Sequence, residues 1–197
     1  MDYQALLARI YQSVDSEAYF APSVQVPQAQ RAAMAQIGAL IRSADFSPDE
    51  ARALTRRLHQ SGRIDRIRML SALHVIEAHP SVGNWDEAAR LVAEQEMAVI
   101  AQGGPRLQTD LAAVERHRGV LAYLNNSYEL ALDYFSRALE RERSAENLQN
   151  VLCTMLRLGE EADACSLLRQ IRQSYPDRIV SLLDQAVETD PDLALLR

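Results

Sequence analysis

Three related stretches decide the fold of this chain: NSYELAL at residues 126–132, GEEADAC at 159–165 and GNWDEAA at 83–89. Each stretch opens with a turn residue, continues with acidic residues and then has an alanine. Ala131 and Ala164 lie 33 residues apart, and Ala88 precedes Ala131 by 43 residues. A motif that returns at intervals of this size is typical of a row of helical hairpins. The longer interval includes the turn Gly103-Gly104-Pro105 and a longer following helix, which take up the extra residues.

The sequence around these stretches predicts helices almost throughout. Apolar residues recur three and four positions apart in runs rich in Ala, Leu, Arg, Gln and Glu, and strand signals are nearly absent. Ser47-Pro48-Asp49-Glu50 combines an N-cap serine, a proline at the first helical position and a glutamate three residues after the cap. Pro22 and Pro27 predict an irregular connection over 19–28. We expect helices near 2–14, 28–43, 48–61, 64–79, 84–101, 106–125, 128–142, 145–158, 161–174 and 177–188.

Small and aromatic residues occupy regular places in the helical pair around residue 131. Gly119 falls in its first helix, Tyr128 at the turn, and Ala131, Phe135 and Ala138 along its second helix. This set resembles the tetratricopeptide repeat, which is about 34 residues long. Small residues let the two backbones of a pair approach closely, while larger apolar side chains fill the space beside them. The next helical pair matches the pattern with Leu152, Gly159, Ala164, Leu168, Ile171 and Pro176. The preceding pair matches it more loosely, with Gly83, Trp85, Ala88 and Val92.

The resemblance implies an all-α fold of stacked antiparallel helix hairpins that form a right-handed superhelix. It divides the chain into N-terminal helices over 1–62, which are a cap and a degenerate repeat hairpin, three repeats over 63–175, and a capping helix with a tail over 176–197. The three repeats cover about 66–101, 107–142 and 145–175. A hairpin cannot cover its own apolar side, so the last repeat needs a cap. We expect that cap to gather its apolar residues on one side: Ile179, Leu182, Leu183, Ala186 and Val187.

Composition and charge limit the classes of function. With 48% hydrophobic and 24% charged residues, the chain has the composition of an ordinary globular protein. All 21 basic residues are arginine, which excludes a Walker-type phosphate loop, a pyridoxal Schiff base and a protein kinase site, since each needs a lysine. The net charge is −6 and the arginines are dispersed, so we expect no nucleic-acid partner. No apolar run approaches about 20 residues and the N-terminus does not resemble a secretion signal, so we expect a cytoplasmic protein without a membrane partner.

No set of residues in the sequence has the spacing of a catalytic or metal site. The motifs G-x-S-x-G, G-x-G-x-x-G and H-E-x-x-H are absent. His74 and His79 flank Glu77, but histidines five positions apart on a helix point away from each other. Cys153 and Cys165 lack a C-x-x-C spacing and are expected to be reduced thiols. We therefore expect no enzymatic activity, no cofactor and no metal ion.

In the proteins that this chain resembles, the first helices of successive hairpins line a concave groove that receives a peptide or an extended segment of a partner. Arginine side chains at such positions could bind carboxylates through two parallel hydrogen bonds, and a tyrosine could offer an amphipathic platform. Some members of the family bind a C-terminal carboxylate with a lysine-rich clamp in this groove. This chain departs from them, because it has no lysine. The groove positions transferred to this sequence are Leu73, Glu77, Arg116, Val120, Tyr123, Gln149, Cys153 and Arg157.

The sequence leaves three hypotheses of function. The first is a non-enzymatic scaffold that binds a protein or peptide segment in its groove. The second is a ligand-sensing regulator of transcription or signalling, whose repeats sense a ligand and whose N-terminal arginine-bearing hairpins touch DNA; steep salt dependence in a gel shift would identify it. The third is a structural subunit that associates with itself through its terminal helices, so that the partner is a second copy.

Overall fold

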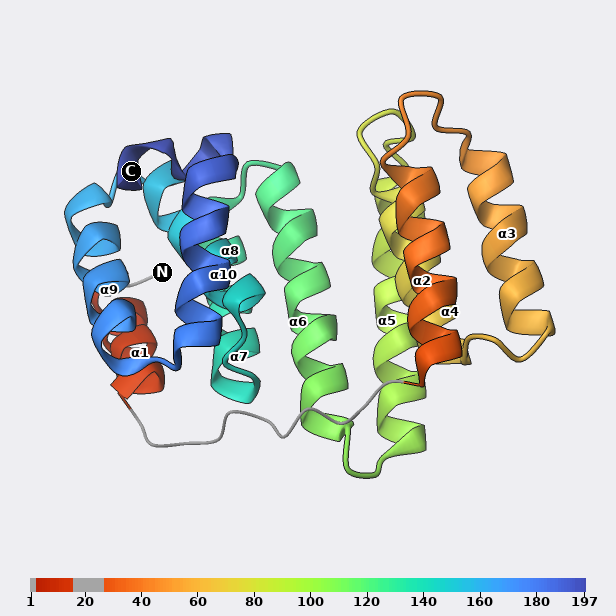
Figure 1. The fold of residues 1–197 in the computed structure, drawn as a ribbon, viewed down its shortest axis with the longest axis horizontal. Helices are drawn as coiled ribbons and strands as arrows, with labels where there is room; N and C mark the ends of the chain where they lie inside the picture. Colours follow the sequence, from red (N-terminus) through yellow and green to blue (C-terminus); the bar gives the residue numbers. More distant parts are fainter. Residues whose placement is uncertain (1–2, 16–26) are drawn as a thin grey trace. The chain divides into compact units, whose positions relative to one another are not determined.

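The structure is a computed structural model that describes residues 3–15 and 27–197. Within those residues it contains helices and no strand (Figure 1). The predicted helices are confirmed, with ends that differ from the prediction by at most two residues. The connection predicted over 19–28 lies, up to residue 26, outside the described residues. The helices are α1 (Tyr3–Asp15), α2 (Gln28–Ile41), α3 (Pro48–Gln60), α4 (Arg66–Glu77), α5 (Trp85–Gln102), α6 (Leu107–Leu124), α7 (Tyr128–Arg141), α8 (Ala145–Arg157), α9 (Glu161–Ser174), α10 (Asp177–Thr189) and the 3₁₀ helix η1 (Pro191–Leu196).

The helices form two compact units. Unit 1 contains residues 3–15 and 108–197, which are α1 and α6 to η1, and unit 2 contains α2 to α5. The first of the three repeats predicted over 63–175 therefore lies in unit 2, and the other two lie in unit 1. Helix α1 packs against α7 and α9, two helices that come much later in the sequence. Its Tyr3 hydroxyl donates a hydrogen bond to Asp163 at the start of α9, over 3.2 Å.

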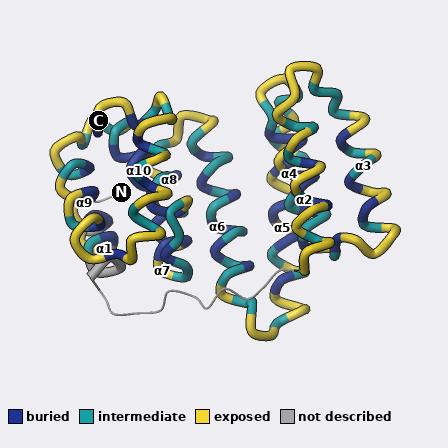
Figure 2. Tube along the Cα trace, in the orientation of Figure 1, coloured by how far each residue is buried: buried dark blue, intermediate teal, exposed yellow. Residues whose placement is uncertain are grey.

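Helix α8 is the centre of unit 1. It packs against α7, α9, α10 and η1, and five consecutive residues from Val151 to Met155 are buried. A helix with one solvent face alternates between buried and exposed residues, as α3 does with Ala51, Thr55 and Leu58 (Figure 2). The continuous burial of α8 means that neighbours cover most of its circumference. One core cluster of buried side chains runs from α1 through α8 to η1.

In the hairpin of α6 and α7, the small residue at position 119 leaves room for an aromatic ring. A Cβ atom at Gly119 would lie 2.5 Å from Cε1 of Phe135, whereas carbon atoms in contact normally lie about 3.5–4.0 Å apart. Phe135 is 2% exposed, and Ala131 and Ala164 are completely buried. Glycine at 119 therefore allows the aromatic ring on α7 to lie against the α6 backbone.

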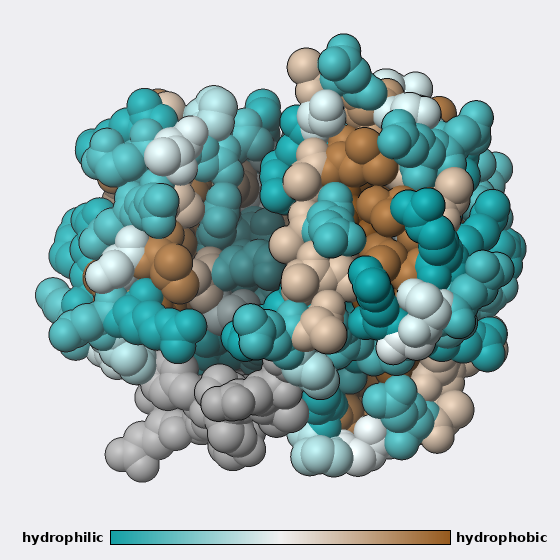
Figure 3. All heavy atoms as spheres, turned by 45° about the vertical axis from the view of Figure 1, so that its right-hand side comes forward, coloured by the Kyte–Doolittle hydropathy of each residue, from teal (hydrophilic) through white to brown (hydrophobic). Residues whose placement is uncertain are grey.

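Unit 2 is built from the hairpin of α4 and α5, with α3 packed on α4 and α2 packed on α3 and α4. Two smaller core clusters hold it together. Met34, Ile41 and Leu54 are only partly buried against the cluster that includes Ile37 and Leu58. Apolar side chains also reach the face of unit 2 that Figure 3 turns forward. No helix in the described ranges has both the length and the apolar character to cross a membrane.

Side chains cap the starts of α3, α4, α8 and η1, and the sequence predicted the first of these caps. The Ser47 hydroxyl accepts a hydrogen bond from the Glu50 amide, over 3.4 Å, as the first residues of α3 predict. Asp65 and Ser144 cap α4 and α8 in the same way. Asp190 caps η1 by accepting from the Asp192 amide over 2.9 Å. A side-chain acceptor at such a position satisfies a backbone N–H that the helix leaves without a partner.

The expected capping helix packs against α8 and buries Leu183 and Val187. The prediction that Leu182 shares this side was wrong, because its side chain is 50% exposed. The chain then turns at Asp190 and forms η1, which packs on α8, α9 and α10. Asp190 and η1, together with Arg197, are called segment 190–197 below. This short helix was not predicted.

Candidate functional site

Five of the predicted groove residues lie together in unit 1. Val120 and Tyr123 are three positions apart on α6, and Gln149, Cys153 and Arg157 follow one another at four-residue spacing on α8. Residues so spaced share one face of a helix. These five residues are called the α6–α8 surface. A pocket of about 130 Å³ opens on it, lined by Val120, Tyr123, Leu124, Phe135, Asn150, Cys153, Asp190 and Asp192.

The α6–α8 surface holds the carboxylate of Asp192 from two sides. The Tyr123 hydroxyl donates to Oδ2 over 2.6 Å, and Nη2 of Arg157 donates to Oδ1 over 2.6 Å. Nε of Arg157 also donates to the Tyr123 hydroxyl over 3.0 Å, and the guanidinium carbon lies 6.0 Å from the tyrosine ring centre. Burial, followed by the hydrogen bond to Asp192, raises the pKa of Tyr123 well above its usual range. The phenol therefore stays protonated and serves as a donor.

The same surface holds the carboxylate of Asp190. Nε2 of Gln149 donates to Oδ2 over 2.7 Å, and the Cys153 sulfur lies 4.0 Å from the same oxygen. Burial, and then the charges of Asp190 and Asp192, raise the pKa of the Cys153 thiol to about 12. A thiol with such a pKa is neither a nucleophile nor a thiolate metal ligand near neutral pH. Cys153 is thus a buried, protonated wall of the pocket.

Arg116, one turn before Val120 on α6, is engaged at the start of α8. Its Nη1 donates to Oδ1 of Asn147 over 3.1 Å, and its Nε lies 3.2 Å from a carboxylate oxygen of Glu146. Asn147 is completely buried, and its amide nitrogen donates to the carbonyl oxygens of Ala138 and Glu142. Arg116 therefore fixes α6 to the α7–α8 turn, beside the α6–α8 surface.

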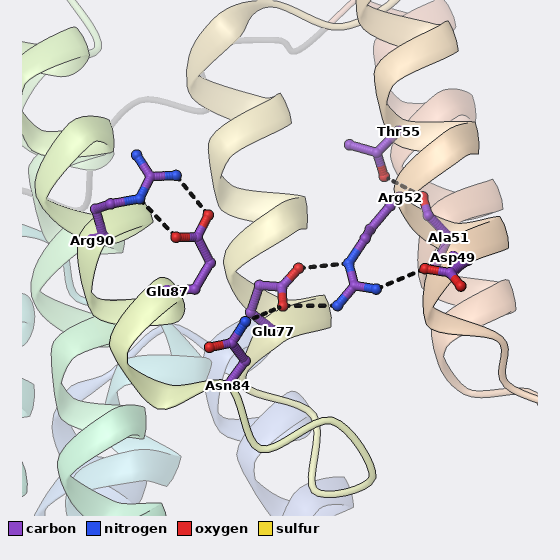
Figure 4. Close-up of polar contacts among 8 residues, drawn as sticks. All are labelled: Asp49, Ala51, Arg52, Thr55, Glu77, Asn84, Glu87 and Arg90. Atoms are coloured by element: carbon purple, nitrogen blue, oxygen red, sulfur yellow. Dashed lines mark hydrogen bonds and ion pairs between the residues drawn. The ribbon is translucent and has the colours of Figure 1, made fainter.

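The remaining two predicted groove residues, Leu73 and Glu77, lie on α4 in unit 2, and both are buried. Leu73 belongs to a core cluster of that unit. Glu77 accepts two hydrogen bonds from Arg52 of α3, over 2.7 and 2.8 Å, and one from the side chain of Asn84, over 3.2 Å (Figure 4). The hydrogen bonds from Arg52 lower the pKa of Glu77, so the pair is charged at neutral pH. Glu77 thus ties α3 and α4 to the residue that precedes α5.

The two histidines that flank Glu77 have separate partners. Nδ1 of His74 lies 3.4 Å from the carbonyl oxygen of Ala88, and burial lowers the pKa of His74 to about 4. Nδ1 of His79 lies 2.8 Å from the Ser81 hydroxyl, and its ring packs on Phe46 with centres 4.3 Å apart. In the part of the chain that the structure describes, no three His, Cys, Asp or Glu residues gather as metal ligands would.

Sequence reasoning missed the two carboxylates that the α6–α8 surface holds. A signal for them was available: Asp190-Pro191-Asp192 has a capping side chain, a proline at the first helical position and an acidic residue after it. The same combination predicted the start of α3 at Ser47. Comparison of the chain with protein-family models, with curated proteins and with solved structures finds no match.

Proposed function

We propose that this protein is a non-enzymatic scaffold of tetratricopeptide-like helical pairs that binds an extended protein segment at the α6–α8 surface. One observation carries the proposal: residues chosen from the sequence as groove positions lie side by side and already hold a segment of the chain by its side chains. A surface that binds one segment through side-chain contacts has the chemistry to bind another of similar chemistry.

The donors of the α6–α8 surface favour the recognition of acidic groups. Tyr123, Gln149 and Arg157 present O–H and N–H donors to carboxylate oxygens, and hydrogen bonds to a charged acceptor are the stronger kind. Val120 and Phe135 supply apolar walls beside them. Ligand pockets commonly combine a mostly apolar lining with a few polar groups that fix orientation.

The helical pairs supply the rigid support that such a site requires. Gly119 and Phe135 lock α6 to α7, and Ala131 and Ala164 are buried where the tetratricopeptide pattern needs small residues. A binding surface on packed helices is held more accurately than one on loops. These features support the tetratricopeptide-like assignment for α6 to α9.

Affinity capture with three forms of the full chain tests the proposal. The baits are the wild type, the double variant Tyr123→Phe/Arg157→Gln, and the matched control Arg172→Gln, which breaks a different arginine–carboxylate pair, with Asp184. Partners identified by mass spectrometry should be lost with the double variant and kept with the control. An identical set of partners on all three baits would mean that the α6–α8 surface is not the binding site.

A further inference from the structure

Segment 190–197 lies on the α6–α8 surface as a ligand would. Leu193 is completely buried and Leu196 is 7% exposed, both within the core cluster of unit 1. Pro191 starts the 3₁₀ turn, which brings the carboxylates of Asp190 and Asp192 toward α8 and α6. Two leucine anchors and two carboxylates therefore fix the segment.

The polar contacts of this segment depend on side chains, and one of them is open to solvent. Asp192 and Arg157 retain side-chain exposures of 32% and 49%, so water reaches their ion pair. An exposed pair of this kind contributes little to stability and opens readily. The Asp190 carboxylate accepts hydrogen bonds from Gln149 and, over 4.0 Å, from the Cys153 thiol on α8, while its third donor, the Asp192 amide, belongs to the segment itself. A competing ligand can therefore replace the contacts of the Asp190 and Asp192 carboxylates.

We infer that segment 190–197 is an internal occupant of the α6–α8 surface, and that the partner presents an acidic segment that supplies the same two carboxylates, two residues apart. This inference rests on the proposed function and names the class of its ligand. The partner segment binds by displacing Asp190 and Asp192 from their donors. The docked segment therefore competes with the partner and lowers its apparent affinity.

Mass action gives the expected size of the effect. A ligand that binds only the open form has an apparent affinity reduced by the fraction of molecules that are open. Asp192 carries the contacts with both Tyr123 and Arg157, so replacing it with asparagine weakens docking while leaving Leu193 and Leu196 in place. We expect Asp192→Asn to raise the affinity for an acidic peptide by about tenfold or more.

The probe is a fluorescent peptide with the sequence of residues 186–197, AVETDPDLALLR, added to the full chain and followed by fluorescence anisotropy. The proteins are the wild type, Asp192→Asn and the matched control Asp184→Asn, which removes a carboxylate of α10 that pairs with Arg172. The probe should bind Asp192→Asn about tenfold more tightly than the wild type, and the control should match the wild type. A second peptide, with asparagine at both aspartate positions, should bind Asp192→Asn at least about tenfold more weakly than the probe.

Two outcomes would overturn the inference. Equal affinity of the probe for the wild type and Asp192→Asn, or no binding to either, would show that segment 190–197 does not compete with an acidic ligand. Concentration-dependent dimers of Asp192→Asn in light scattering would show that the occupant is the same segment of a second copy. If the probe fails while Tyr123→Phe/Arg157→Gln still loses captured partners, only the acidic-ligand inference is wrong. If that double variant loses no partners, the proposed function itself is wrong.

Discussion

Replacing Gly119 with alanine tests the close contact between α6 and α7. The added Cβ would lie 2.5, 2.6 and 2.9 Å from three ring atoms of Phe135. The ring is 2% exposed and belongs to the core of unit 1, so the ring and its neighbours must shift to admit the added atom. Overpacking of this kind costs about 1–3 kcal/mol, and three contacts this short indicate the upper part of that range. Alanine regains about 1 kcal/mol because it favours a helix over glycine. We expect a net loss of about 2 kcal/mol.

The assay is urea unfolding followed by far-ultraviolet circular dichroism, with thermal unfolding as a second measurement. A loss of about 2 kcal/mol corresponds to a melting temperature lower by roughly 4–8 °C for a chain of this size. The matched control is Gly38→Ala in α2, where the Cβ meets only the end of the flexible Arg42 side chain, at 3.1 Å. That control should keep or raise the stability, by up to about 1 kcal/mol.

A second substitution separates the steric clash from other effects. In Gly119→Ala/Phe135→Leu the clashing ring is gone, so the double variant should lose less stability than the two single variants together. If Gly119→Ala alone is as stable as the wild type, the Phe135 ring does not lie as close to the α6 backbone as the structure has it, and the reasoning from small residues is refuted.

Three further variants test other contacts. Glu77→Gln should cost about 2 kcal/mol of stability at neutral pH, because it weakens the buried pair with Arg52. Since folding lowers the pKa of Glu77, this cost should shrink as the pH falls below about 4.3. Unfolding curves at several pH values would measure it. Ser144→Ala should cost about 1 kcal/mol in urea unfolding, through loss of the α8 cap. In a Cys165→Ser background, iodoacetamide at pH 8 should modify Cys153 on the order of a thousandfold more slowly than free cysteine, because its thiol pKa is about 12; a rate near that of free cysteine would contradict the burial.

Much of the helical architecture could be predicted because its signals are local. Helix ends follow from capping residues such as Ser47 and from glycines such as Gly159, whose positive φ of 82° ends α8. Gly119 and Phe135 lie within a single hairpin, and the repeat pattern marked both positions without pairing them. Local steric and capping preferences act over only a few residues, and a sequence displays them directly.

The contacts missed by the sequence join residues that are far apart in it. Tyr3 meets Asp163 across 160 positions, and nothing in the first helix indicates that α7 and α9 will receive it. Glu77 has the residue type and position of a groove residue, yet Arg52, 25 positions earlier, takes its carboxylate. Periodicity states which face of a helix is apolar, but not which helix covers it.

The sequence predicted the surface of the candidate site but not the segment that lies on it. Its α6 and α8 residues follow from helical spacing and from the tetratricopeptide resemblance, which assigned Tyr123 and Arg157 to one surface. The occupant of that surface depends on where the chain turns after α10. A 3₁₀ helix of six residues leaves too short a pattern for periodicity, and the pairing of Arg157 with Asp192 is a tertiary contact.

Amide chemical shifts would test most directly whether the α6–α8 surface binds an extended acidic segment. The peptide AVETDPDLALLR would be added to isotope-labelled Asp192→Asn full chain, and the shifts would be assigned to residues. The changes should centre on Tyr123 of α6 and on Gln149, Cys153 and Arg157 of α8. Changes centred on α3 and α4, or on the exposed residues of α9, would show that the segment does not bind at the α6–α8 surface.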